Sequence, residues 1–461
     1  MEAGARRESF AKRNPLCHPA RVNAPSPSSQ TTTPSHLPKQ RMAVLFAVML
    51  VAAAGNTAMQ SILPALGTRL GIADVLISLA FSWSALLWMI TAPRWARVSE
   101  RRGRKALMVT GISGFSVSML LCGLALWAGI EGWIGPVLTF VLFSLFRSLY
   151  GGFGSAAPPA VQAYVAARTD PAERTKALSL VASSFGLGTV IGPTLAPWLI
   201  LPVVGLSGPM LMFSLIGVAV IFAIRLGLPD DTPRFPARGV TPYYPAAATA
   251  GAAQTLGDDE SASAETPEAK RISWFDPRVR NWSIVGLASG HAQAMTLGVI
   301  GFLVLDRLAL RATPEAAAAP TGHVLWVGAI ATLLSQWGLI PMLALRPKAA
   351  VVGGGLAAGL GIAALGVART PENIALAFAL ASLGFGLLRP GFTSGASLSV
   401  PRSQQGAVAG QNASIAGASY VAAPALGVLA YGAAPVTTFV VIGAATILLA
   451  LWSAWALKDV G

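Results

Sequence analysis

The sequence predicts an all-α polytopic membrane protein with twelve transmembrane helices in two pseudo-symmetric six-helix bundles. Hydrophobic residues make up 54% of the 461 residues and charged residues only 11%, whereas soluble globular proteins carry about 25% charged residues. The hydrophobic residues gather in runs long enough to cross a bilayer, which takes roughly 20 residues of helix. These runs form two sets of six on either side of a polar stretch.

The first six apolar segments lie between residues 42 and 228, which we expect to form the N-terminal bundle. They run from Ala43 to Leu66, Val75 to Trp95, Ala106 to Gly129, Gly135 to Val165, Ala177 to Leu201 and Leu206 to Leu228. The other six lie between residues 281 and 457, the predicted C-terminal bundle. They run from Asn281 to Leu305, Gly322 to Leu345, Ala349 to Val367, Ile374 to Val400, Gly406 to Tyr431 and Pro435 to Leu457.

Three polar segments flank the two bundles. Residues 1–41 are rich in Pro, Ser, Thr and Arg and predict a disordered cytoplasmic tail that lacks the apolar stretch of a signal peptide; Met42 is an alternative start. Residues 229–280 are polar, with acidic and basic clusters, and predict a cytoplasmic linker rather than a domain. Residues 458–461 form a short cytoplasmic C-terminus.

Positive charge is distributed unequally between the loops. The net charge of +14 would suggest nucleic-acid binding in a soluble chain, but membrane topology and anionic lipid headgroups explain cations beside apolar spans better. With both termini cytoplasmic, the loop cations on the outer side are only Arg69, Arg307, Arg311 and Arg369. We therefore expect a multi-pass protein of the cytoplasmic (inner) membrane. The abundance of Ala and Gly is typical of a GC-rich bacterial genome.

The two halves repeat several features. Spans four and ten each carry one arginine among glycines, Arg147 and Arg389. Spans five and eleven each carry a proline after a small residue, Pro193 and Pro424. Two repeated bundles with a substrate site between them, near the bilayer midplane, are typical of secondary transporters.

A basic loop, Ala96 to Lys105, joins spans two and three and reads A-R-V-S-E-R-R-G-R-K. It resembles the signature loop of the major facilitator superfamily, in which an acid, a glycine and several cations stand at fixed spacing. The matching residues are Glu100, Arg101, Gly103, Arg104 and Lys105. Glu100 replaces the usual Asp, and Ala96 replaces the usual first Gly. The alternative is a basic loop that only determines topology.

The resemblance covers essentially Met42 to Leu457 and implies a transporter in which two bundles rock about a central site. It also implies that the basic loop acts as a conformational latch on the cytoplasmic side. In the family, the acid of this loop contacts the start of the eleventh helix. We therefore expect Glu100 near Gln405 or Gly406, where a helix N-terminus favours an anion.

A stretch of span four resembles a second motif of this superfamily. Arg147 precedes Gly151 and Gly154, and small residues at this spacing allow close helix packing. An arginine within a bilayer is costly unless it has a partner, so the resemblance implies a role near the substrate or proton path. A structural arginine bonded to backbone carbonyls is the alternative.

Span five resembles the motif that exporters of the superfamily carry in their fifth helix. It contains Gly188, Gly192 and Pro193 within G-L-G-T-V-I-G-P. Proline bends a helix, and glycines four residues apart open a face for packing. The trailing glycines of the family motif are here Ala196 and Pro197, so generic helix packing is the alternative.

The spans hold no acidic residue in their middle, although the chain has 19. This argues against export of cationic drugs through a buried carboxylate. The polar residues available are Asn56 and Gln60 in span one and His291 and Gln293 in span seven. Histidine changes its charge near neutral pH, so His291 is our candidate for carrying a coupling proton; a hydrogen-bonded packing residue is the alternative.

Arg147 and Arg389 occupy similar depths in spans four and ten. If both face the cavity, their charges favour an anionic or amphipathic substrate; otherwise Arg389 snorkels or pairs structurally. Aromatic residues of spans two, four and eight either line the cavity or pack between helices. They are Phe81, Trp83, Trp88, Tyr150, Trp326 and Trp337.

The sequence predicts a secondary active transporter and not an enzyme, with no catalytic residues. It contains no phosphate-binding loop, nucleophile elbow or metal-spaced His/Cys set, and Cys17 and Cys122 offer no disulfide framework. We expect proton-coupled efflux (antiport) of a small organic molecule by a monomer that needs the bilayer and a proton gradient, but no cofactor, metal or nucleic acid. The alternatives are proton-coupled uptake (symport), facilitated diffusion of an organic anion, and a non-transporting receptor or scaffold.

Overall fold

The computed structural model describes residues 37–166, 168–169, 171–230, 273 and 275–459. These residues are almost entirely helical, and they form 12 helical spans that are long and apolar enough to cross a membrane. Extended pairing among the described residues is limited to an isolated bridge between Leu201 and Gly205. The predicted all-α fold with twelve membrane-length helices is therefore confirmed. Most of the predicted tail and most of the predicted linker lie outside the described residues.

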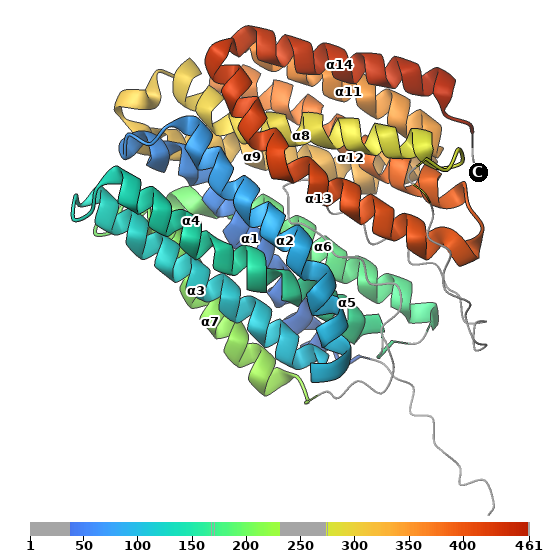
Figure 1. The fold of residues 1–461 in the computed structure, drawn as a ribbon, viewed down its shortest axis with the longest axis horizontal. Coiled ribbons are helices and arrows are strands. Elements are labelled where there is room, and N and C mark those ends of the chain that lie inside the picture. Colours follow the sequence, from blue (N-terminus) through green and yellow to red (C-terminus); the bar gives the residue numbers. More distant parts are fainter. Residues whose placement is uncertain (1–36, 167, 170, 231–272, 274, 460–461) are drawn as a thin grey trace, which may run out of the picture. The chain divides into compact units, whose positions relative to one another are not determined.

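The N-terminal bundle contains α1 to α7, drawn from blue to green in Figure 1. Its elements are α1 (Lys39–Arg69), α2 (Asp74–Arg102), α3 (Arg104–Ile130), α4 (Pro136–Phe153), η1 (Gly154–Ala156), α5 (Ala157–Ala166), α6 (Pro171–Leu195), η2 (Ala196–Leu199) and α7 (Gly208–Gly227). Helix α1 packs against α6 and α7, and α3 packs against α4 and α7. Lys39, in the segment predicted as tail, already belongs to α1.

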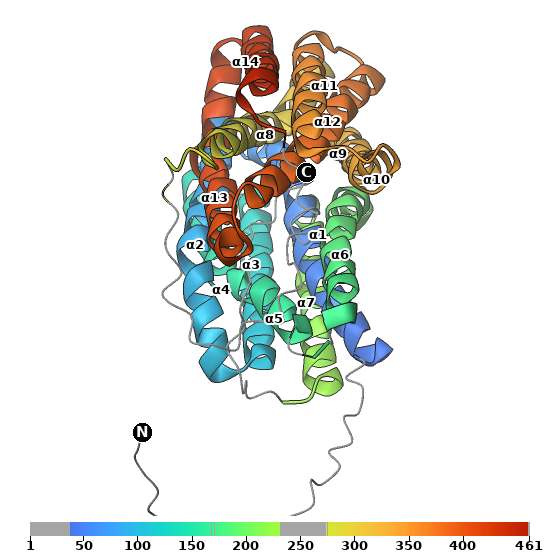
Figure 2. The ribbon, with the colours of Figure 1, turned by 90° about the vertical axis from the view of Figure 1, so that its right-hand side faces the viewer.

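The C-terminal bundle contains α8 to α14, drawn from yellow to red, and forms a second group of helices in both views (Figures 1 and 2). Its elements are α8 (Arg280–Arg307), η4 (Leu310–Ala312), η5 (Pro314–Ala317), α9 (Ala318–Leu333), η6 (Leu334–Leu339), α10 (Ile340–Met342), α11 (Pro347–Val367), α12 (Pro371–Leu398), α13 (Arg402–Ala433) and α14 (Pro435–Ala456). Helix α11 packs against both α12 and α14, and α8 packs against α13.

The basic segment that we predicted as a loop is mostly helix. Helix α2 continues through it to Arg102 and α3 begins at Arg104, so that Gly103 alone joins them. Gly103 has a φ of 89°, a backbone conformation that glycine adopts freely and that other residues avoid. The hydropathy pattern locates where a span leaves the bilayer, but charged residues can extend the same helix beyond it.

Two membrane spans depart from regular α-helix. Span four breaks at η1 and resumes as α5, which begins immediately before Pro158 and Pro159. Prolines lack the N–H donor that a continuous helix needs, but they are tolerated in the first turn of a new helix. Span eight contains the π-helical segment η6 between α9 and α10, and such segments are frequent at functional sites.

Ion pairs join the two bundles at one end of the helices, which we call the closed end. Arg311 after α8 binds Asp74 at the start of α2, with 2.7 Å between Nη2 and Oδ2. Arg69 at the end of α1 binds Glu315 in η5 at 3.3 Å. Between the ends of the helices, α2 packs against α13 and α6 against α9, so that both bundles border the same interior.

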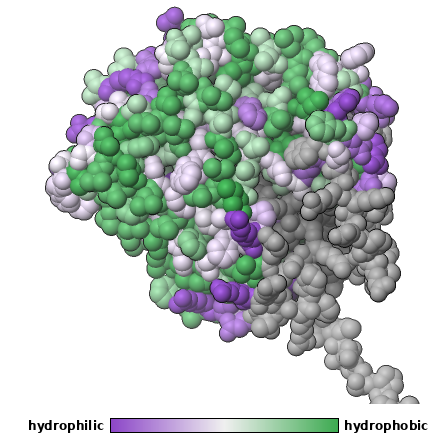
Figure 3. Space-filling model, viewed as in Figure 1, coloured by the Kyte–Doolittle hydropathy of each residue, from purple (hydrophilic) through white to green (hydrophobic). Residues whose placement is uncertain are grey.

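The opposite end of the helices is the basic end, where α2 ends and α8 begins. Its described cations include Lys105, Arg225, Arg278 and Lys348. Between the two ends many large apolar side chains are exposed, Leu145 and Leu448 among them. Figure 3 shows hydrophobic residues over most of one face, with hydrophilic residues gathered near the ends of the helices. Exposed apolar surface of this extent fits contact with lipid.

Candidate functional site

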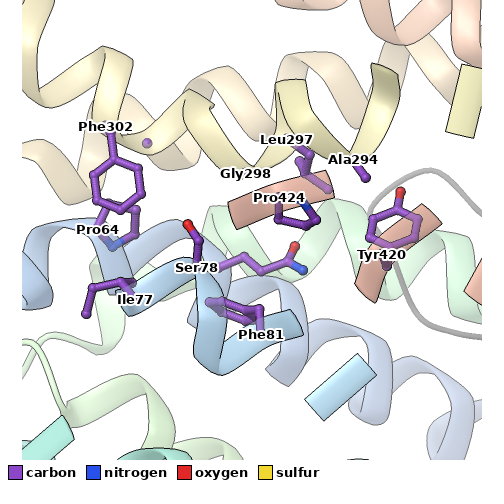
Figure 4. Close-up of a pocket in the computed structure, with 12 residues that line it drawn as sticks. Pro64, Ile77, Ser78, Phe81, Ala294, Leu297, Gly298, Phe302, Tyr420 and Pro424 are labelled. Carbon is purple, nitrogen blue, oxygen red and sulfur yellow. The ribbon is translucent and has the colours of Figure 1, made fainter. Parts of the chain in front are cut away.

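A cavity lies between the two bundles and is bordered by four helices (Figure 4). The lining residues are Gln60 and Pro64 of α1, Ile77, Ser78 and Phe81 of α2, Ala294, Leu297, Gly298, Gly301 and Phe302 of α8, and Tyr420 and Pro424 of α13. We call it the central cavity. Its volume is about 50 Å³, which holds a few water molecules and not a drug-sized ligand. The bundles must therefore move apart before a larger molecule can bind here.

The wall of the central cavity combines apolar and polar groups. Figure 4 shows Phe81 and Ser78 of α2 facing Leu297 of α8 and Pro424 of α13. Of the site residues predicted from the sequence, Gln60 and Pro424 line it. The Oε1 atom of Gln60 is buried and accepts no hydrogen bond from any described residue. A buried acceptor without a donor costs about 1–3 kcal/mol, and a bound molecule with a donor group would remove that cost.

Arg147 of α4 lies behind the central cavity. Its side chain is fully buried, and Nη2 donates a hydrogen bond to Oδ1 of Asn56 on α1. The guanidinium carbon lies 5.2 Å from the ring centre of Phe81 and 4.6 Å from that of Tyr150, which are cation–π distances. Phe81 lines the cavity and Arg147 does not, so the aromatic ring lies between the arginine and a bound molecule.

No acid among the residues that the structure describes balances the charge of Arg147. Arg147 forms no ion pair with a described residue, and its Nε and Nη1 atoms have no hydrogen-bond partner among the described residues. Its contacts are a neutral amide and two aromatic rings. In a low-dielectric interior an uncompensated charge acts over several ångströms, so Arg147 makes the neighbouring cavity attractive to negative charge.

Two predicted site residues of the C-terminal bundle, His291 and Arg389, lie apart from the group formed by Arg147 and its contacts. The Nδ1 atom of His291 lies 2.7 Å from the carbonyl oxygen of Leu287, one turn earlier in α8. His291 stands seven residues before Gly298, so it lies on the helix face that lines the central cavity, but nearer the basic end. Arg389 of α12 is half-buried and lines neither the central cavity nor the second one described next.

A second, smaller cavity lies inside the C-terminal bundle between α8, α9 and α12. Its polar wall includes Gln293 of α8, Thr332 of α9 and Ser382 of α12, and Oγ1 of Thr332 donates to the carbonyl oxygen of Ser382 at 3.1 Å. Gln336 in the adjacent η6 is buried, and its amide has no hydrogen-bond partner among the described residues. Gln336 is not among the site residues predicted from the sequence, although a glutamine within an apolar span was a signal for it.

The glycines of the predicted packing motifs stand at close contacts between helices. A β-carbon on Gly151 would lie 2.5 Å from the carbonyl oxygen of Ser84 in α2. A β-carbon on Gly188 would lie 2.8 Å from Cβ of Ala53 in α1, and one on Gly192 would also strike α1. These glycines therefore let α2 and α4, and α1 and α6, approach more closely than larger residues would allow.

The two predicted hinge prolines lie where helices meet. A β-carbon on Gly322 of α9 would lie 2.5 Å from the carbonyl oxygen of Pro193 in α6, across the bundle boundary. A β-carbon on Gly298 of α8 would lie 2.9 Å from Cα of Pro424 in α13. Gly154, the last glycine of the span-four motif, begins the η1 break.

Part of the predicted latch can be described. Gly103 makes the turn, Arg104 is buried, and Nζ of Lys105 donates to Oδ1 of Asp230 and to the carbonyl oxygen of Arg225, both at 3.0 Å. Both contacts of Lys105 join residues of the N-terminal bundle and of the segment that directly follows α7. The side chains of Glu100, Arg101 and Gln405 lie outside the described part of the structure, so the predicted contact of Glu100 with Gln405 or Gly406 is not described.

The ion-pair network of the closed end was not predicted from the sequence. Arg311 binds Asp306 as well as Asp74, and Asp306 accepts a hydrogen bond from the Tyr431 hydroxyl at 2.9 Å. Hydrogen bonds to Asp306 and then to Asp74 raise the pKa of the Arg311 guanidinium, which therefore stays charged. The signal was the position of Asp74 and Asp306 at the borders of spans.

Within the described residues, no cluster of His, Cys, Asp or Glu could hold a metal ion.

Comparison with known proteins identifies the relatives of this chain. The family described as Major Facilitator Superfamily matches residues 45–424. Multidrug resistance protein 2 of Bacillus subtilis is 36% identical over 110 residues, 24% of each chain. Efflux pump azaK of Aspergillus niger is 30% identical over 125 residues, 27% of this chain and 23% of that one. The matches thus span about a quarter of the length of these relatives.

The fold is also that of a solved structure. The crystal structure of the human organic anion transporter MFSD10 (TETRAN) superimposes with a TM-score of 0.59 at 18% sequence identity. The superposition covers 90% of this chain and 100% of that one. At this identity the likeness concerns the fold alone.

Proposed function

This chain is a member of the Major Facilitator Superfamily, and from that membership we propose that it exports a small organic molecule in exchange for protons. The family places it among membrane transporters rather than enzymes, as predicted. Its twelve membrane-length helices make it a multi-pass membrane protein. We propose that it works as a monomer in the bacterial cytoplasmic membrane, because the two bundles of one chain border the central cavity.

The observation that carries the proposal is the central cavity itself. Its lining comes from α1 and α2 of one bundle and from α8 and α13 of the other, so rocking of the bundles changes its size and access. The excess of cations favours the basic end in the cytoplasm. In our proposal both termini are cytoplasmic and the closed end faces outward, so that the basic end is the one that parts to admit molecules from the cytoplasm.

Export is supported by two independent features. The matched relatives are named for multidrug resistance and for efflux. In addition, Gly188 and Gly192 place α6 directly against α1, and this stretch resembles the motif of exporters. Proline and glycine at such a contact allow the helix to bend while it remains packed.

An anionic or amphipathic substrate suits the interior best. Arg147 supplies a positive charge without a partner acid, Phe81 supplies an aromatic surface, and Gln60 supplies an amide. None of the residues that line the central cavity is acidic. A cationic drug would therefore meet an unfavourable potential there, whereas a carboxylate would meet a favourable one.

His291 is the coupling residue in our proposal. It is the described histidine on the cavity-lining face of α8, and histidines within membrane helices serve as proton carriers in transporters. Exchange requires that the proton and the exported molecule occupy the transporter in turn. In our proposal His291 takes up a proton in the outward-open form after the molecule has left, and releases it to the cytoplasm before the next molecule binds.

The test is proton flux in liposomes that contain purified protein and a pH-sensitive dye. Anionic, neutral and cationic compounds are added in turn to the wild type, Arg147→Gln, His291→Gln and the control His323→Gln, whose imidazole lies in α9 outside both cavities. We expect flux with anionic compounds, a loss of at least about tenfold in Arg147→Gln, no flux in His291→Gln, and wild-type flux in the control.

Three outcomes would overturn parts of this proposal. Flux with cationic compounds alone would exclude the anionic substrate. Movement of labelled compound without a proton signal would exclude proton coupling and indicate facilitated diffusion. Accumulation of compound on the cytoplasmic side together with protons would replace export by symport.

A further inference from the structure

A third cavity lies at the basic end of the C-terminal bundle, where α8 begins and α12 and α14 end. Its volume is about 250 Å³, larger than that of the central cavity. Arg278 and Asn281 border it at the start of α8, Ser399 follows α12, and Lys458 follows α14. The transport cycle proposed above has no use for this cavity, because the two bundles do not share it.

Two cations border the cavity, and they differ in whether they form an ion pair with a described residue. Arg278 is held by Asp276 through two hydrogen bonds, Nε to Oδ1 at 3.0 Å and Nη2 to Oδ2 at 2.7 Å, which leaves Nη1 available. Because Arg278 hydrogen-bonds its carboxylate, the pKa of Asp276 falls to about 2, and the pair stays intact at neutral pH. Lys458 forms no ion pair with any described residue, since the neighbouring Asp459 binds Lys348 instead.

Apart from Asn281 and Ser399, the remaining wall of the cavity is apolar, and it lies at the border of the hydrophobic belt. The buried indole of Trp282 and the side chain of Leu457 form part of its wall. The residues next to the lining are exposed and apolar: Trp455 is 86% exposed and Phe275 is 80% exposed. Aromatic residues concentrate at the level of lipid headgroups, so the mouth of the cavity stands at that level.

We propose that this cavity binds the phosphate-bearing headgroup of an anionic phospholipid. The phosphate contacts Nη1 of Arg278 and Nζ of Lys458, and the glycerol and first methylenes lie at the mouth of the cavity beside the exposed side chains of Trp455 and Phe275. Basic pockets between membrane helices on the cytoplasmic side are suited to such headgroups. A free phosphate would use the same cations but would leave these apolar side chains uncovered. The bound lipid joins α8, α12 and α14, and stabilises the C-terminal bundle.

The test uses the full-length protein in neutral detergent with added lipid. Binding of phosphatidylglycerol is measured by native mass spectrometry and by the shift in Tm, and phosphatidylcholine and inorganic phosphate serve as the comparison probes. The variant is Arg278→Gln combined with Lys458→Gln. The matched control is Arg280→Gln, which removes an exposed cation of the same segment that does not line the cavity.

We expect phosphatidylglycerol to bind and to raise the Tm of the wild type and of Arg280→Gln. Its affinity should fall about 30-fold in the double variant, since two basic contacts are lost. Equal binding of phosphatidylcholine, equal binding to the double variant, or an equal Tm shift with inorganic phosphate alone would each overturn the proposal. Because this readout involves no transport, failure here leaves the proposed export untouched.

Discussion

The two ends of the helices hold the bundles in different ways. At the closed end, Arg311 and Arg69 form ion pairs that cross from one bundle to the other. At the basic end, the ion pairs between described residues stay within one half of the chain: Lys105 binds Asp230 and Lys348 binds Asp459. Both ends are rich in charge, but among the described residues only the charges of the closed end connect the bundles.

This difference indicates that the basic end can part without breaking any ion pair between described residues of the two bundles. Opening the closed end must separate Arg311 from Asp74 and Arg69 from Glu315. Each partly exposed pair contributes about 0.2–1 kcal/mol, so together they shift the conformational equilibrium but do not lock it. A transporter needs such a balance, because a change of a few kcal/mol on substrate or proton binding must reverse it.

The largest effect should come from a covalent link across the closed end. In Asp74→Cys combined with Arg311→Cys, a short bifunctional thiol reagent holds the bundles together, and transport should fall more than tenfold because the bundles cannot rock. The matched control is Lys105→Cys with Asp230→Cys at the basic end, where a link stays within one half. Liposome flux before and after treatment checks both. Equal inhibition in the two variants would contradict the comparison of the ends.

Removal of Arg311 should release the closed end. Arg311→Ala loses two ion pairs, with Asp74 and Asp306, and should shift the equilibrium toward the form open at that end by about 1 kcal/mol, or about fivefold. Thiol labelling of a cysteine placed at Ser78, a buried residue of the central cavity one turn from Asp74, measures the change and leaves the ion pairs in place. Arg311→Lys keeps the charge and should restore most of the wild-type labelling rate, which a purely steric effect of the arginine would not allow.

A smaller shift in the same direction is expected from Tyr431→Phe. This variant removes the hydrogen bond from the Tyr431 hydroxyl to Asp306 and leaves Arg311 in place. A single net hydrogen bond contributes about 0.5–1.5 kcal/mol, and Asp306 keeps Arg311 as a partner. The same labelling assay should give a shift below that of Arg311→Ala. A shift as large as in Arg311→Ala would mean that Tyr431 supports the whole network.

The smallest effect is expected at the basic end. Lys105→Gln breaks the pair with Asp230, whose side chain is 99% exposed, and water replaces most of that interaction. Both the labelling of the closed end and the Tm of the protein should stay within error of the wild type. A marked change in labelling would show that Lys105 acts between the bundles, as the predicted latch requires.

Much of the fold was predictable because bilayer insertion depends on local properties of the chain. Each span is a run of apolar residues, and its length follows from the thickness of the membrane. Gly103 and the paired prolines 158 and 159 also act locally, through backbone conformation. The segment from Ala96 to Arg102 was wrongly predicted as a loop because hydropathy is also a local property. Hydropathy indicates which residues are buried in lipid, and it does not indicate whether a helix continues beyond the membrane into water.

The sequence by itself thus determined the twelve spans, the two bundles and the presence of a costly arginine in span four. Tertiary structure decided which groups meet: Asn56 of α1 binds Arg147 of α4, and Asp74 of α2 binds Arg311 after α8. Helix packing brings these partners together from distant positions in the chain. The physical reason is that hydrophobic patterning places a residue within the membrane, whereas the choice of its partner depends on the shape and rotation of every helix packed around it.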